Sequence, residues 1–141
     1  MATVTAKDIR ALRRYFVTAE TMRVRAQKMM DKYGPDELMF DKPQFAKFFG
    51  YTSLWFSTLW VALDGWRELG LSDDHIQEVL DDDRMDLLRQ FRNVTFHFKR
   101  EYVAPRHLAF LTAEDSMAWV FNAHYSLNVA LMEASRDFGS D

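Results

Sequence analysis

The sequence predicts an all-α protein, a single-domain bundle of about five helices over residues 1–141. Three observations support this fold class. Apolar residues recur at three- and four-residue steps through most of the chain, and no segment shows the strict alternation of a strand. Glycine and proline residues interrupt the periodic segments where helices would end. A length of 141 residues corresponds to about one ordinary domain.

The first two helices are predicted over residues 5–33 and 43–69. The dipeptide Gly34-Pro35 is expected to end the first helix. In the second helix, Pro43 takes the first position, where proline is tolerated, and Gly70 supplies the C-terminal stop. The second helix is apolar over more than half of its circumference, which is typical of a central helix or of an oligomer interface.

The acidic segment of residues 71–83 predicts a short third helix and the start of a fourth. We expect Ser72 to be the N-cap of the third helix, and the run Asp81-Asp82-Asp83 to form the cap and first turn of the fourth. Consecutive side chains diverge on a helix, so these aspartates predict no metal site. The fourth helix is expected to continue to about residue 102. Its predicted core stripe comprises Leu87, Leu88, Phe91, Val94 or Thr95, and Phe98.

A connection is expected over residues 103–111, around a proline that ends or kinks the fourth helix. The fifth helix is predicted from residue 113 to about residue 138, with Thr112 as its cap and Gly139 at its end. Its predicted core stripe is Met117, Val120, Phe121, His124, Leu127, Leu131 and Ala134. A histidine on this stripe is interpreted as a core residue and not as a catalytic group.

Composition limits the classes of function. The absence of cysteine excludes disulfides, thiolate nucleophiles and cysteine-ligated metals, and it favours a cytoplasmic protein. We expect no secretory signal and no membrane span, because the uncharged run of residues 48–63 is shorter than the roughly 20 apolar residues that a spanning helix needs. Glycine-rich phosphate loops and the short motifs of metalloproteases and serine hydrolases are absent.

Charge is unevenly distributed along a chain whose net charge is −3. Residues 7–33 carry eight Lys or Arg against three Asp or Glu, and residues 84–107 carry six against two. The first and fourth helical segments therefore predict a basic surface despite the acidic total. An ordinary solvated charge pattern is the alternative interpretation.

The segment Arg92-Asn93-Val94-Thr95-Phe96-His97 places a permanent cation, an amide and an imidazole within six positions. Its R-x4-H spacing resembles the motif of the HEPN superfamily, small all-helical proteins that include many RNA-cleaving toxins and defence nucleases. Asn93 fits the polar residue common after the arginine in that motif. Arg100 and His107 have a similar spacing, but Pro105 lies between them and argues against one shared helix.

The resemblance implies a HEPN-like helical homodimer that binds RNA and cleaves it as a metal-independent endoribonuclease, with no cofactor. Arg92 would hold the scissile phosphate, and His97 would act as general acid or base. Asn93 would orient the phosphate, the imidazole or the partner chain. For toxin members of the family, a cognate antitoxin protein is the expected further partner.

Helical geometry limits how these residues can meet. At 100° per residue, Asn93 and His97 share a face that continues to a glutamate one turn later. Arg92 lies about 140° from His97, so its side chain must bend or the helix must loosen near its end. The candidate substrate-binding residues next to the motif are Lys99, Arg100 and Glu101, with Arg106 as a further candidate for a phosphate contact. Glu101 either orients the imidazole or is a surface residue.

Two other functions are compatible with the same residues. One is a non-catalytic helical interaction or dimerisation module that retains the scaffold, in which Arg92 pairs with Asp64 or Glu68 and His97 is buried. The other is a small-molecule sensor whose pocket is lined by tryptophans of the second helix, namely Trp55, Trp60 and Trp66.

Overall fold

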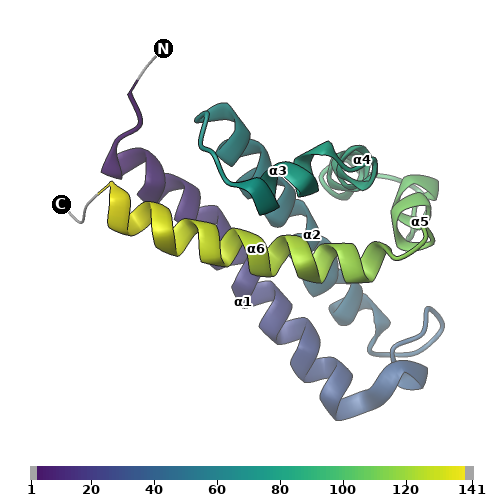
Figure 1. Cartoon of the computed structure of the whole chain (residues 1–141). Helices are drawn as coiled ribbons and strands as arrows, with labels where there is room; N and C mark the ends of the chain where they lie inside the picture. The colour runs from purple at the N-terminus through teal and green to yellow at the C-terminus, as the bar shows by residue number, and fades with distance from the viewer. Residues whose placement is uncertain (1–2, 139–141) are drawn as a thin grey trace.

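A helical hairpin of α1 (Ala6–Glu37) and α2 (Phe45–Glu68) forms the base of the computed structural model, which describes residues 3–138. The other helices are α3 (Asp74–Asp81), α4 (Arg84–Thr95), α5 (Pro105–Leu111) and α6 (Ser116–Asp137). Residues 3–138 thus form six helices and no strand, which confirms the all-α class. In Figure 1, α6 lies across the α1–α2 hairpin, and α3, α4 and α5 follow one another beside α2.

The ends of the long helices largely follow the sequence prediction. Thr5 caps α1, because its hydroxyl accepts the Asp8 N–H at 3.3 Å while its own N–H donates to the Asp8 carboxylate at 3.0 Å. Gly34 breaks the helix with φ 77°, and a short helical turn follows to Glu37. Gly70 adopts φ 69° just beyond α2, as a C-terminal glycine does.

Two predicted caps are wrong, and one helix begins later than predicted. The N-cap of α3 is Asp73 and not Ser72, because the Asp73 carboxylate accepts the Ile76 N–H at 3.0 Å. Thr112 ends α5 instead of starting the next helix, and Asp115 precedes α6. The helix α2 begins two residues after Pro43. The predicted end of the last helix at Gly139 lies outside the described residues.

The largest corrections concern the segment between α4 and α6. The helix α4 ends at Thr95, not near residue 102, and the expected connection over residues 103–111 contains α5. Pro105 occupies the first turn of α5, where its missing N–H costs nothing, so it begins a helix. Phe98, predicted in the core stripe, is 93% exposed, because it lies beyond the end of α4.

The core is built around aromatic rings contributed by several helices. Phe56 of α2, Phe91 of α4 and Phe110 of α5 are fully buried, and their ring centroids lie 5.4–5.9 Å apart. On α6, Met117 and Phe121 are exposed, so this part of the predicted stripe is wrong. The buried residues of α6 are Ser116, Trp119, Val120, Ala123, His124, Leu127, Ala130, Leu131 and Ala134.

The tryptophans of α2 do not form the expected shared pocket. Trp55, Trp60 and Trp66 are all buried in the hydrophobic core. Trp60 and Trp66 line two different surface hollows and not one shared pocket. None of the helices formed by residues 3–138 combines the length and the apolar character that a membrane crossing requires.

Because α4 ends at Thr95, Phe91 and Phe98 should contribute differently to stability, although the periodic pattern placed both in the core stripe. We expect Phe91→Ala to lower the free energy of unfolding by about 3–5 kcal/mol, because it empties a fully buried site. We expect Phe98→Ala to change it by less than about 0.5 kcal/mol, because the ring is exposed. Urea denaturation followed by circular dichroism measures both. Similar losses in the two variants would contradict the position at which α4 ends.

Candidate functional site

An open groove of about 370 Å³ lies where α2, the end of α4 and the following loop meet α5. Its lining includes three residues that the sequence singled out, His97, Lys99 and Glu101. All three side chains are exposed to solvent. An imidazole, an ammonium and a carboxylate therefore share one accessible surface, although His97 and Glu101 do not share a helical face with Asn93 as predicted.

The predicted helical face is absent because α4 ends earlier than expected. Because α4 ends at Thr95, His97 and Glu101 belong to the non-helical segment 96–104 and no longer follow Asn93 at helical spacing. Within the described residues, His97 makes no hydrogen bond or ion pair, so Glu101 does not orient its ring in this structure. The imidazole of His97 is thus free to contact a ligand.

Arg92 is held away from the groove. Its guanidinium lies over the ring of Trp60 at 4.2 Å from the centroid, and its Nε donates to Asn93 Oδ1 at 3.2 Å. Within residues 3–138 it forms no ion pair with either acid predicted as its partner, and Asp64 pairs with Arg67 instead. The structure therefore does not bring Arg92 and Asn93 together with His97 in the groove of one protomer.

His107 forms the buried side of the groove. The Ala104 N–H donates to its Nδ1 at 3.0 Å, so the ring proton resides on Nε2, which donates to the Thr95 hydroxyl at 3.1 Å. The Thr95 hydroxyl in turn donates to the Phe91 carbonyl at 2.9 Å. Burial lowers the pKa of His107, which favours the neutral ring. With both nitrogens engaged, His107 positions the site and is not available for proton transfer.

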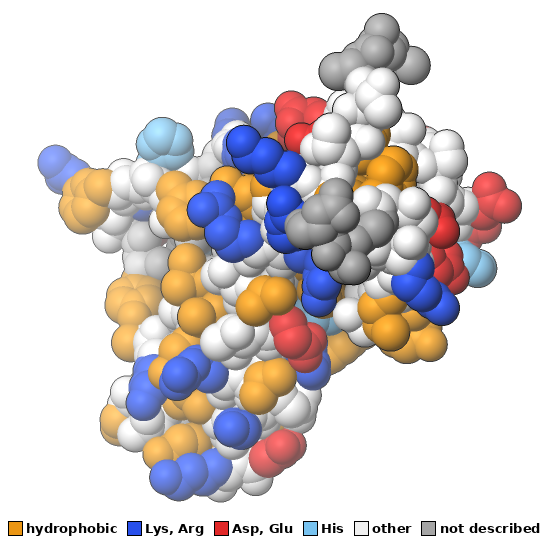
Figure 2. All heavy atoms as spheres, turned by 90° about the vertical axis from the view of Figure 1, so that its left-hand side faces the viewer, with side chains coloured by type: hydrophobic (Ala, Val, Ile, Leu, Met, Phe, Trp, Pro, Cys, Tyr) orange, Lys and Arg blue, Asp and Glu red, His pale blue; other side chains and the backbone are white. Residues whose placement is uncertain are grey.

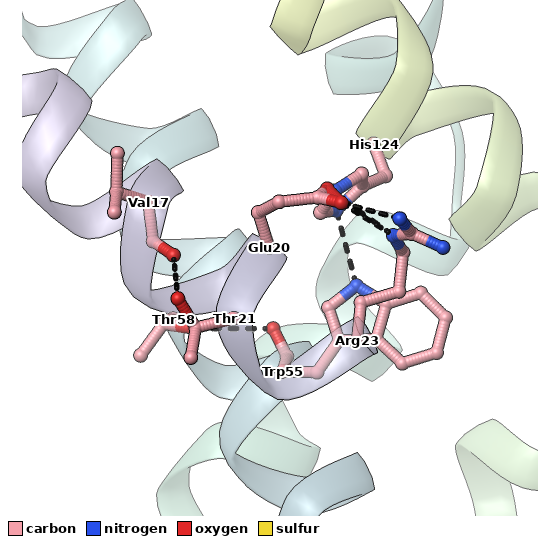
Figure 3. A network of polar contacts seen from close by, with 7 residues as sticks. All are labelled: Val17, Glu20, Thr21, Arg23, Trp55, Thr58 and His124. Carbon is pink, nitrogen blue, oxygen red and sulfur yellow. Dashed lines mark hydrogen bonds and ion pairs between the residues drawn. The ribbon is translucent and has the colours of Figure 1, made fainter. Parts of the chain in front are cut away.

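A second buried histidine joins three helices, and the sequence did not reveal its partners (Figure 3). Trp55 Nε1–H of α2 donates to His124 Nδ1 of α6 at 3.1 Å, and His124 Nε2–H donates to Glu20 of α1 at 2.8 Å. Arg23 donates to the same carboxylate from its Nε at 3.1 Å. Burial lowers the pKa of His124, and the nearby carboxylate offsets part of this effect. His124 is a core residue, as predicted.

Part of the predicted basic surface is present on α1. Arg13, Arg25 and Lys28 border a groove of about 530 Å³ between α1 and α6, with Phe16 and Leu131 among its apolar lining. Figure 2 shows Lys and Arg side chains spread over one face of the molecule, with hydrophobic side chains between them. The contribution of α4 is small, since two of its arginines are paired with aspartates of neighbouring positions, Arg84 with Asp82 and Arg89 with Asp86.

Comparisons with protein-family models, with curated proteins and with solved structures found no match for this chain. The function therefore has to be inferred from the groove itself. That groove contains one of the three predicted catalytic residues, His97, and two of the three predicted substrate-binding residues, Lys99 and Glu101. Arg100 is exposed on the same loop but does not line the groove.

The two buried histidines predict a pH dependence of stability. Burial lowers the folded-state pKa of His107 and of His124 below the usual value of 6.5, so the unfolded chain binds more protons than the folded chain between these values. Their contribution is present above pH 6.5 and is lost as the pH falls through the lowered pKa values. We expect urea denaturation at pH 7.5 and 5.5 to show lower stability at pH 5.5.

The variant that tests this dependence is the double substitution His107→Gln and His124→Gln. We expect its stability, although lower overall, to change less between the two pH values, because neither glutamine titrates. The substitution His75→Gln, on an exposed position of α3, serves as the matched control and should retain the wild-type difference. An equal difference in the double variant and in the control would contradict the assignment to the buried rings.

Proposed function

We propose that the chain is a HEPN-like RNA-binding protein and a metal-independent endoribonuclease in which His97 is the general acid or base. The observation that carries the proposal is the open groove that unites His97, Lys99 and Glu101. An imidazole that has no partner among residues 3–138 is available to exchange a proton with a substrate hydroxyl. The neighbouring ammonium supplies positive charge for a phosphate.

The chemistry suited to these groups is transesterification of RNA. His97 takes the proton of a 2′-hydroxyl, the 2′-oxygen attacks the adjacent phosphorus, and the bond from phosphorus to the 5′-oxygen breaks. The products are a 2′,3′-cyclic phosphate and a chain with a free 5′-hydroxyl, which takes up a proton. Lys99 stabilises the negative charge that develops on the phosphate oxygens. This reaction needs no oxidant, reductant or metal to balance.

Arg92 has a different position in this proposal from the one that the motif suggests. Its guanidinium packs on Trp60 and bonds to Asn93, so within one protomer Lys99 takes the role of the phosphate contact. Arg92 and Asn93 reach a composite site only across a homodimer, the assembly that the HEPN resemblance implies. The proposal therefore assigns proton transfer to His97 and leaves Arg92 a role at the subunit boundary.

An RNA cleavage assay in the presence of EDTA tests the proposal. We expect wild-type protein to cleave RNA and His97→Ala to lose roughly 10²- to 10⁴-fold in rate, the usual contribution of a general acid or base. His75→Ala replaces an exposed histidine of α3 and should leave the rate unchanged. Analysis of the product ends should detect the cyclic phosphate.

Two results would remove the enzyme assignment. One is the absence of cleavage by wild-type protein on both structured and unstructured RNA. The other is equal cleavage by wild type and His97→Ala, which would indicate a contaminating nuclease or a different catalytic group. Both replaced side chains are exposed, so we expect both variants to fold like the wild type. Circular dichroism of the variants checks this and excludes unfolding as the cause of a lower cleavage rate.

A further inference from the structure

The loop that follows α4 combines three aromatic side chains with an imidazole and three charged side chains, in the order Phe96-His97-Phe98-Lys99-Arg100-Glu101-Tyr102. Its aromatic residues are exposed, Phe98 to 93%, Phe96 to 59% and Tyr102 to 54%. Leaving three large aromatic side chains of one short segment in water is unfavourable, and such surfaces usually mark a binding site. The loop therefore presents a surface that gains free energy when something covers it.

One of the three exposed rings, that of Tyr102, belongs to the groove of His97, and the other two belong to the same short loop. Tyr102 lines that groove and also a neighbouring apolar groove of about 540 Å³. In the second groove its ring centroid lies 6.0 Å from Phe40 and 5.7 Å from Phe45. Tyr102 thus connects the groove of His97 with aromatic rings of the second groove. A ligand whose flat rings stack at one end can place a reacting group beside His97 at the other.

The charges of the loop indicate the nature of that ligand. Lys99, Arg100 and Arg106 are exposed, and within the described residues none of them forms an ion pair. A second copy packed directly on these three side chains would have to bury the cations or supply carboxylates to pair with them, so the homodimer of the proposed function leaves this part of the loop exposed. RNA matches the pattern, because its phosphates pair with cations and its bases stack on aromatic rings.

We propose that the segment 96–102, together with Phe40, is a base-stacking site for single-stranded RNA. Bases stack on Phe98 and on the other exposed rings, while Lys99 and Arg100 contact the phosphates between them. Duplex RNA is a poor ligand, because its bases are already stacked and its deep major groove is closed to side chains. The inference rests on the proposed function and narrows its substrate to unpaired RNA.

Fluorescence anisotropy tests the inference without cleavage of the probe. The probe is a labelled single-stranded RNA methylated at every 2′-oxygen, which removes the nucleophile of the proposed reaction. We expect Phe98→Ala to weaken binding roughly 5- to 140-fold, as the loss of one stacked base does. Tyr125→Ala is the matched control, because Tyr125 is an aromatic residue of α6 that is 69% exposed, and it should leave affinity unchanged.

Two modified probes separate stacking from charge. An oligonucleotide of the same length with abasic positions keeps the phosphates but lacks the rings, so it should bind the wild type weakly and should not distinguish Phe98→Ala from wild type. A fully paired duplex should also bind more weakly than the single strand. Lys99→Ala should weaken binding to all probes. It should also lower the slope of log Kd against log salt concentration by about 1, the value for one lost phosphate contact.

The outcomes for the loop and for catalysis are distinguishable. Binding that depends on Phe98 and on the bases supports the stacking site whether or not His97-dependent cleavage is found. Equal affinity of wild type and Phe98→Ala, or of the abasic and complete probes, overturns it even if His97 cleaves RNA. Sedimentation that changes from dimer to monomer in Phe98→Ala, with RNA affinity unchanged, also overturns it and assigns the rings to a subunit interface.

Discussion

The candidate site depends on the hydrogen bonds of one buried imidazole. His107 accepts the Ala104 N–H and donates to the Thr95 hydroxyl, so it joins the end of α4 to the start of α5. Its ring also packs against Phe91 and Phe49, with centroids 4.6 Å and 5.2 Å away. These contacts fix both ends of segment 96–104. The side chains between the two ends therefore have a defined position, although they remain exposed.

This arrangement divides the histidines by role. His107 and His124 are buried, use both ring nitrogens in hydrogen bonds, and have pKa values lowered by burial, so they connect helices and stay neutral. His97 lies beyond the end of α4 and is exposed beside Lys99. A fixed frame and a free imidazole are the combination that acid–base chemistry on an external substrate requires. In the proposed function, the cations of the loop are the reason for choosing RNA as the substrate.

Local signals were enough to predict the helical class and much of the long hairpin, because a cap such as Thr5 and a stop such as Gly70 act within one turn. The end of α4 was missed because apolar spacing continues to Phe98, while the hydrogen bond that competes with it comes from His107, twelve residues away from Thr95. The sequence did contain a signal for the start of α5. Proline favours the first turn of a helix, and Pro105 is followed two residues later by His107.

Contacts between residues that are far apart in the sequence could not be predicted from the sequence alone. The partners Glu20 and His124 are 104 positions apart, and Arg92 rests on Trp60 of another helix instead of reaching His97. His97, Lys99 and Glu101 line one groove although their segment is a loop and not the predicted helix. They stay near one another because they are separated by only a few residues in the sequence. Their roles in RNA binding and cleavage remain predictions.

The most direct test of RNA binding at the groove is an NMR titration of the imidazole signals with single-stranded RNA that lacks 2′-hydroxyls. The account predicts that the ring signals of His97 shift, while those of the buried His107 and His124 stay nearly constant and His75 on α3 does not respond. Ring signals of His97 that stay unchanged at saturating RNA, or that shift no more than those of His75, would contradict it.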